Sequence, residues 1–146
     1  MTAERSEVVI VPCSGIGKPY GTVSREAAYE LCDALRPGAT RLVALAKLVL
    51  GEEEARAHVR TCPAVAIDGC QLRCAAKLVT LSGGRIVHEV SVLDVYRRHR
   101  DLKPEGLEAL NEAGLALARV LAAELAEVVD RLGRAGAAPE GSPCSR

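Results

Sequence analysis

Cysteine is the residue type best suited to chemistry in this chain of 146 residues. The sequence contains six of them, which are Cys13, Cys32, Cys62, Cys70, Cys74 and Cys144. A thiolate attacks electrophiles and coordinates soft metal ions. In a reducing compartment, several thiols indicate metal binding or redox chemistry more than disulfides. Which thiols can act together therefore depends on where the fold places each cysteine.

Cys70 and Cys74 are the most closely spaced pair. The sequence predicts a helix from about Cys70 to Leu81, with Asp68 as its N-cap. Residues four apart on a helix share one face, with Cβ atoms about 5–6 Å apart. With Zn–S bonds of about 2.3 Å, one ion can bridge such a pair. The first helical turn also favours the thiolate form of Cys70.

Cys13 is expected to join this pair at the edge of a sheet. Val8–Val11 and Ala64–Ile67 are short apolar runs, typical of strands buried on both faces of a parallel sheet. Cys13 follows the first run and Cys70 follows the second. Because ligands bind beyond the carboxyl ends of such strands, we predict that Cys13 lies near Cys70 and Cys74.

Cys62 is the weaker candidate for a fourth ligand. It precedes the strand Ala64–Ile67, and therefore starts at the opposite edge of the sheet. A strand of four residues spans about 13–14 Å, which separates Cys62 from the other thiols. Cys32 lies on an apolar helix face and is expected in the core, and Cys144 lies in the tail.

The remaining elements alternate between helices and strands, which predicts a single α/β domain over residues 1–133. A mainly parallel sheet is expected, with flanking helices in Rossmann-like layers. A helix should start near Thr22 or Ser24 and another should cover Glu52–Arg60. Thr40–Leu50 is a strand, or a strand running into a short helix, and Arg85–Leu93 is a strand.

A long C-terminal helix is predicted from Pro104 to about Leu132. Its apolar face carries Leu107, Leu110, Gly114, Leu117, Leu121, Leu125, Val128 and Leu132 at helical spacing. The tail 134–146 is rich in Gly, Pro, Ala and Ser, and we expect it to be disordered.

The composition of the chain argues against two classes of protein, namely nucleic-acid-binding proteins with a basic surface and membrane-spanning proteins. Lys plus Arg and Asp plus Glu both number 19, and this balance argues against binding nucleic acid through a basic surface. No apolar run approaches the ~18 residues of a membrane helix, so no membrane span is expected. The polar start Met1–Glu7 does not look like a signal peptide, and we expect a bacterial-type cytoplasmic protein.

Several segments resemble the DGC-domain family, which is named after its Asp-Gly-Cys motif and whose members are proposed to bind zinc. The resemblance rests on Cys13-Ser14-Gly15, on Ile67-Asp68-Gly69-Cys70 and on Cys74-Ala75-Ala76-Lys77. Val92-Leu93-Asp94-Val95 loosely resembles the family's later Thr-Asp-Leu-Gly-Ile segment. The similar region covers most of Val8 to about Arg100.

The resemblance implies a small cytoplasmic protein with four cysteines that hold zinc. Three of them match here, as Cys13, Cys70 and Cys74. The family's other cysteine falls in a segment like Val43-Ala44-Leu45, which has none in this chain. Either Cys62 replaces it, or three thiolates leave an open position that would suit transfer or catalysis.

Three hypotheses follow. The first is a metal-binding protein, with zinc preferred over Cu(I), an Fe–S cluster or another soft metal. The second is a redox or sulfur-transfer enzyme with Cys70 or Cys13 as its nucleophile. The third is an interaction module that forms a homodimer through the long C-terminal helix.

Overall fold

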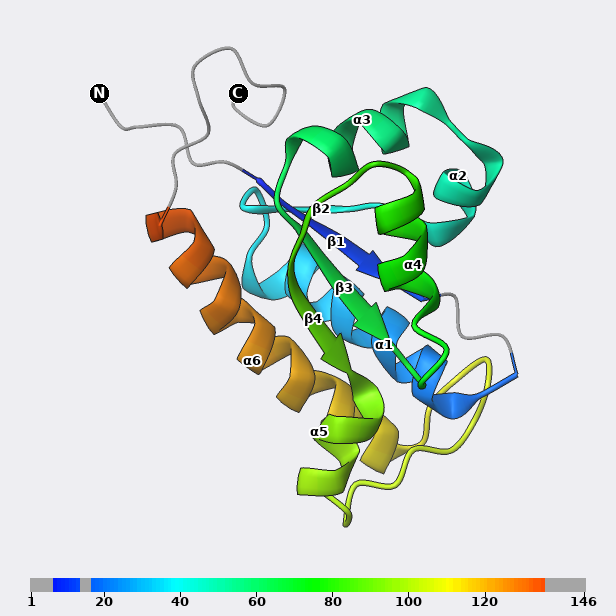
Figure 1. Cartoon of the computed structure of the whole chain (residues 1–146). Coiled ribbons are helices and arrows are strands. Elements are labelled where there is room, and N and C mark those ends of the chain that lie inside the picture. The colour runs from blue at the N-terminus through cyan, green and yellow to red at the C-terminus, as the bar shows by residue number, and fades with distance from the viewer. Residues whose placement is uncertain (1–6, 14–16, 136–146) are drawn as a thin grey trace.

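The computed structural model describes residues 7–13 and 17–135. Along the chain, the elements are β1 (Val8–Pro12), α1 (Pro19–Tyr29), the π-helix η1 (Glu30–Leu35), β2 (Thr40–Leu42), α2 (Leu45–Leu50), α3 (Glu53–Thr61), β3 (Ala64–Asp68), α4 (Cys74–Leu81), β4 (Ile86–Ser91), α5 (Val92–Arg98) and α6 (Glu112–Ala135). Figure 1 shows a sheet flanked by helices, with the long α6 lying across one side.

The four strands are all parallel and lie in the order β2-β1-β3-β4. The predicted α/β architecture with a parallel sheet and a long C-terminal helix is confirmed. In the central pair, Val9 lies beside Ala64 and Pro12 lies beside Ile67. The chain runs from β1 outward to β2 and later returns to β3 on the other side of β1. The strand order thus reverses between β1 and β3, where open parallel sheets bind ligands.

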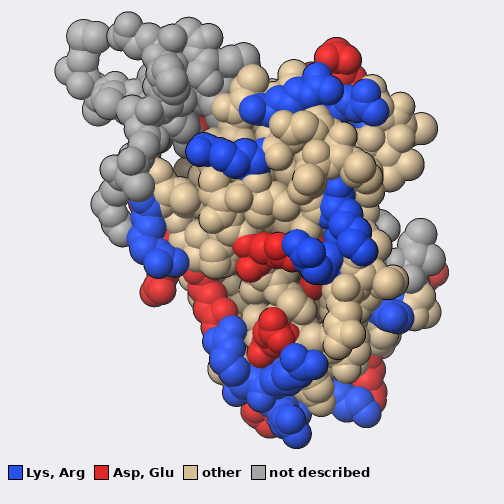
Figure 2. All heavy atoms as spheres, in the orientation of Figure 1, with Lys and Arg blue, Asp and Glu red and all other residues tan. Residues whose placement is uncertain are grey.

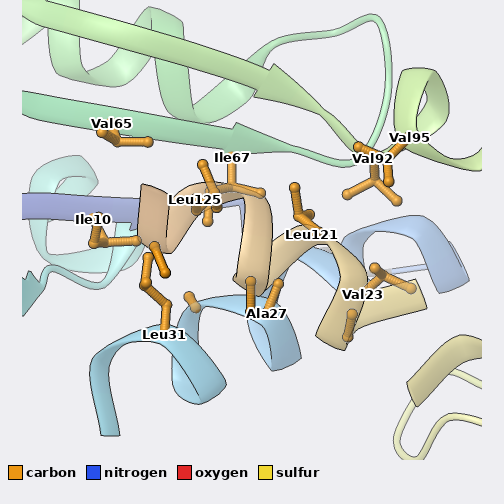
Figure 3. Packing of buried hydrophobic residues seen from close by; sticks show 14 of the residues in the cluster. Ile10, Val23, Ala27, Leu31, Val65, Ile67, Val92, Val95, Leu121 and Leu125 are labelled. Carbon is orange, nitrogen blue, oxygen red and sulfur yellow. The ribbon is translucent and has the colours of Figure 1, made fainter. Parts of the chain in front are cut away.

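One face of the sheet is covered by α1, η1, α5 and α6. Ile10 of β1 and Ile67 of β3 belong to this core and are fully buried. Figure 3 shows Leu121 and Leu125 of α6 pointing toward Ile67, with α1 beneath them. Full burial of each such side chain contributes about 1.5–3 kcal/mol to folding. The apolar face of α6 is therefore used inside the fold.

The opposite face of the sheet is covered by α2, α3 and α4. Strand residues that alternate with the first set, such as Val9 and Ala66, pack here against Val59 of α3 and Val79 of α4. Both central strands are buried along their whole length, which explains why their sequences are continuous apolar runs.

The helices α1 and α6 begin elsewhere than the sequence suggests. α1 starts at Pro19, ahead of Thr22, because proline suits the first helical position. α6 starts at Glu112 and not at Pro104. The Asn111 side chain accepts hydrogen bonds from the N–H groups of Gly114 at 2.8 Å and Glu105 at 3.1 Å, so it caps α6 and holds the preceding loop.

Two structures were possible for Thr40–Leu50, a strand alone or a strand that runs into a short helix, and the second is found. The expected strand Arg85–Leu93 ends at Ser91, where α5 begins. α6 continues to Ala135, and the rest of the expected tail lies outside the described residues. Within the described ranges, no helix has both the length and the apolar character of a membrane span.

Candidate functional site

Cys13 and the Asp68-Gly69-Cys70 segment lie at the carboxyl ends of neighbouring parallel strands. Cys13 follows β1 directly, and its N–H donates to the carbonyl oxygen of Ile67 at 2.9 Å. The pairing of β1 with β3 therefore continues to the last residue before the loop. The expected meeting of the two trailing loops occurs at the point where the strand order reverses.

The Sγ atom of Cys13 sits among hydrogen-bonding groups from two other segments. The N–H of Gly69 donates to it at 3.2 Å. The Ser24 hydroxyl of α1 lies 3.2 Å from the same sulfur and 2.6 Å from the Gly21 carbonyl oxygen. Ser24 is fully buried, so its position is fixed by the fold. These groups hold the Cys13 side chain in one place.

The environment of Cys13 raises the pKa of its thiol. Burial is the largest cause, and the charges of Asp68 and Cys74 act in the same direction. The hydrogen bonds from Ser24 and Gly69 act in the opposite direction. Cys13 is therefore held as a thiol that becomes a thiolate more readily when a positive charge is placed beside it.

Gly69 must be glycine for these loops to meet. A Cβ atom built on Gly69 would lie 2.7 Å from the backbone nitrogen of Gly21 and 2.9 Å from its Cα. Contacts this short with backbone atoms do not occur in real structures. The glycine of the Asp-Gly-Cys motif thus allows the β3–α4 loop to rest directly on the start of α1.

Asp68 is buried and caps α4 from a distance. Its Oδ1 accepts from the Ala75 N–H at 2.7 Å and its Oδ2 accepts from the Ala76 N–H at 3.1 Å. Burial raises the pKa of this carboxyl, although the two backbone hydrogen bonds act to lower it. Asp68 therefore fixes the start of α4 relative to the end of β3.

The predicted helical pair of Cys70 and Cys74 is wrong. α4 begins at Cys74, and Cys70 lies in the loop before it, so the two do not share a helical face. The Asp68 carboxylate reaches the N–H groups of the seventh and eighth residues after it, and the residues between them form a loop. Arg73 ends this loop in the left-handed conformation with φ of 54°. Its guanidinium binds both carboxylate oxygens of Glu89.

The donor chemistry of the site fits a soft metal ion, but the arrangement supplies no complete ligand set. Cys13, Cys70 and Cys74 are free thiols, with Cys74 exposed and the other two partly buried. In residues 7–13 and 17–135, no three His, Cys, Asp or Glu side chains are grouped closely enough to hold an ion. Binding through all three thiols would therefore require these residues to move closer together.

Cys62 and Cys32 lie away from this edge. Cys62 is buried at the end of α3, next to the amino end of β3. It is thus separated from Cys13 by the length of the strand, as expected. Cys32 lies in η1 and packs against the core, which agrees with the role expected for it, and burial raises the pKa of its thiol. Cys144 lies outside the described residues.

Sequence reasoning missed Ser24 and Gly21 as parts of the site. The sequence indicates only that a helix starts near Thr22 or Ser24, and nothing in it indicates that Ser24 faces Cys13. Its role depends on the helix starting earlier, at Pro19, which places Ser24 inside α1 with its hydroxyl 3.1 Å from the carbonyl oxygen of Cys13.

Comparison with known proteins identifies the family of the chain. The family model described as the DGC domain matches residues 9–113, a span that contains Cys13, Cys62, Cys70 and Cys74. No curated protein and no solved structure matches the chain. The matched span covers more than half of the sequence and includes both loops that meet at the edge of the sheet. On this evidence the chain belongs to the DGC-domain family.

Proposed function

We propose that this protein binds a soft metal ion, zinc first, through Cys13, Cys70 and Cys74. The observation that carries the proposal is the hydrogen bond from the Gly69 N–H to Cys13 Sγ at 3.2 Å. It joins the thiol at the end of β1 to the Asp-Gly-Cys loop at the end of β3. Thiolate ligands select zinc, Cu(I) and Fe–S clusters over hard cations, and these remain the metal alternatives.

Each of the three cysteines would contribute differently. Cys13 is fixed, since the Gly69 N–H and the Ser24 hydroxyl both lie 3.2 Å from its sulfur. The Gly69 N–H is a donor that would orient a coordinating thiolate and tune its basicity. Cys74 is at the start of a helix capped by Asp68, and Cys70 is on the loop between them. The loop would close on the ion while the two ends stay in place.

Three protein thiolates leave one coordination position for water or a ligand, and this arrangement is typical of catalytic and transfer sites. Cys62 is left out of the proposal because it lies at the other end of β3. We further propose that the protein works in the cytoplasm, where Cys13, Cys70 and Cys74 would stay reduced; Cys62 is disulfide-bonded in the structure. A homodimer through α6 would need its exposed residues, since the apolar face of the helix is buried.

Elemental analysis tests the proposal. The protein is purified under reducing conditions without added metal, and metal per chain is compared for the parent and for Cys13→Ser, Cys70→Ser and Cys74→Ser. We expect near-stoichiometric metal in the parent and a large loss in each variant. Cys32→Ser is the matched control, because Cys32 is a partly buried free cysteine away from the site. Equal metal content in all four variants, or none in the parent, would refute the assignment.

Thiol chemistry without a metal is the second candidate. It is favoured by the free state of Cys13, Cys70 and Cys74, together with the lack of any grouped set of three ligands among the described residues. Cys70 or Cys13 would be the nucleophile, and a second cysteine would resolve the mixed disulfide. Metal-free protein in which one thiol is alkylated much faster than the others would support this function.

A further inference from the structure

A cavity with charged residues in its wall lies beside the cysteine site, beyond the ends of β3 and β4. Its volume is about 270 Å³, just below the usual range of roughly 300–1,000 Å³ for small-molecule sites. The walls come from the β3–α4 loop, the end of β4 and α5. Figure 2 shows acidic and basic side chains mixed on the lower part of this face. The size indicates a ligand about as large as an amino acid.

Two ion pairs form parts of the wall. The Arg73 guanidinium binds both oxygens of Glu89, with Nη2 to Oε2 at 2.8 Å. The Arg97 Nη1 donates to Asp94 Oδ1 at 2.9 Å. A guanidinium has more N–H donors than these bonds use, and a carboxylate accepts several hydrogen bonds. Both pairs are thus held in position with donors and acceptors left for a ligand.

The charges favour a ligand that carries both signs. The two guanidinium groups and the carboxylates of Glu89 and Asp94 cancel, and the carboxylate of Asp68 already accepts two backbone N–H groups. A phosphate-like dianion would face two carboxylates, and a bare cation would face two guanidinium groups. A zwitterion places each of its charges against an opposite one, and such complementarity gives specificity.

Cys70 also lines this cavity, so a ligand bound there would lie next to this residue. We propose that the cavity binds a thiol-bearing amino acid such as cysteine. The ligand carboxylate would bind Arg97, its ammonium group would bind Asp94, and its thiol would lie toward Cys70. The choice of a thiol rests on the proposed function, since Cys70 is one of the proposed metal ligands. Recognition of the zwitterion does not depend on that function.

Calorimetric titration of the full chain, reduced with a phosphine and freed of metal with a chelator, tests recognition of the zwitterion. The probes are L-cysteine, cysteamine, which lacks the carboxylate, and 3-mercaptopropionate, which lacks the ammonium group. Loss of a charge-assisted hydrogen bond weakens binding by about tenfold or more. We therefore expect both truncated probes to bind at least about tenfold more weakly than L-cysteine.

Arg97→Gln should weaken the binding of L-cysteine by a similar factor. Arg98→Gln is the matched control, because Arg98 is on the same helix but pairs with Glu124, away from this cavity. Equal binding of the three probes, equal effects of the two substitutions, or no binding of L-cysteine at millimolar concentrations would each overturn the proposal.

L-serine separates this inference from the proposed function. In metal-free protein, L-serine should bind within a few-fold of L-cysteine, since both are zwitterions of nearly the same shape. Protein loaded with zinc should prefer L-cysteine. If elemental analysis finds no bound metal but both amino acids bind, the proposed metal function fails and the zwitterion site stands. If loaded protein shows no preference, the choice of a thiol is overturned.

Discussion

The N–H of Gly69 donates a hydrogen bond to the Sγ of Cys13 at 3.2 Å, across 56 positions of the sequence. This contact makes one site out of two loops that follow neighbouring strands. It depends on the close approach of Gly69 to Gly21, which leaves no room for a Cβ atom. The stability of the fold and the integrity of the site are therefore linked at Gly69.

Gly69→Ala should destabilise the protein by about 1–3 kcal/mol, because the new Cβ meets backbone atoms that cannot move cheaply. Urea unfolding followed by circular dichroism measures the free energy of unfolding. Gly133→Ala is the control: a Cβ there contacts nothing within 4 Å, and alanine should stabilise this part of α6 by up to about 1 kcal/mol. A Gly69→Ala variant as stable as the parent would show that the loops do not pack as described.

Asp68 should make the stability of the metal-free protein depend on pH. Burial raises the pKa of this carboxyl in the fold, so the folded state keeps the proton to higher pH than the unfolded state. The stability contributed by Asp68 is thus full below the ordinary pKa near 3.8 and is lost as the pH rises through the folded pKa.

The measurement is the difference in unfolding free energy between the parent and Asp68→Asn, followed from about pH 3.5 upward. Asparagine keeps one oxygen to accept from the first turn of α4 but cannot ionise. We expect the advantage of the parent over the variant to shrink as the pH rises. An advantage that grows with pH would mean that the N–H groups of Ala75 and Ala76 dominate over burial.

Ser24 should control the reactivity of Cys13 in metal-free protein. Its hydrogen bond lowers the pKa of the Cys13 thiol against the effect of burial. Ser24→Ala removes that bond, and we expect Cys13 to be alkylated severalfold more slowly by iodoacetamide at pH 8, as followed by mass spectrometry. Thr80→Ala is the control, since the Thr80 hydroxyl donates only within α4. Unchanged or faster alkylation in Ser24→Ala would contradict this role.

The central strands and the position of Cys13 could be predicted because they follow from local pattern and general sheet topology. Val8–Val11 and Ala64–Ile67 have no polar face, so they had to lie inside a sheet covered on both sides. Once both are neighbouring parallel strands, Cys13 must lie at the same edge as Asp68.

The start of α4 could not be predicted, because it depends on contacts that are distant in sequence. Local rules place a cap two or three residues before the N–H groups that it accepts. Here the Asp68 carboxylate reaches Ala75 and Ala76, since Gly69 rests on Gly21 and turns the loop. The proposed pairing of Cys70 with Cys74 on one helical face failed for this reason. Asn111, by contrast, is a residue type that commonly caps helices, but Pro104 indicated an earlier start for α6.

Cys62→Ala should keep most of the bound metal, provided that the protein is purified under reducing conditions. Cys62 is buried beside the amino end of β3, and the strand carries the chain away from it toward Asp68. Alanine avoids placing a hydroxyl in that buried position. Metal per chain is measured by elemental analysis against the parent. Loss of the metal in this variant, with its fold intact by circular dichroism, would make Cys62 a ligand.

If three protein thiolates hold the metal ion, its fourth coordination position should be open to water or an added ligand. Protein loaded with cobalt in place of zinc should change its visible spectrum when 2-mercaptoethanol or azide is added, because the added ligand replaces water. The same titration of Cys62→Ala should give the same change, since Cys62 lies at the far end of β3. A spectrum that ignores both ligands would indicate four protein ligands around the ion. The site would then be closed, and a structural role would replace transfer or catalysis as its function.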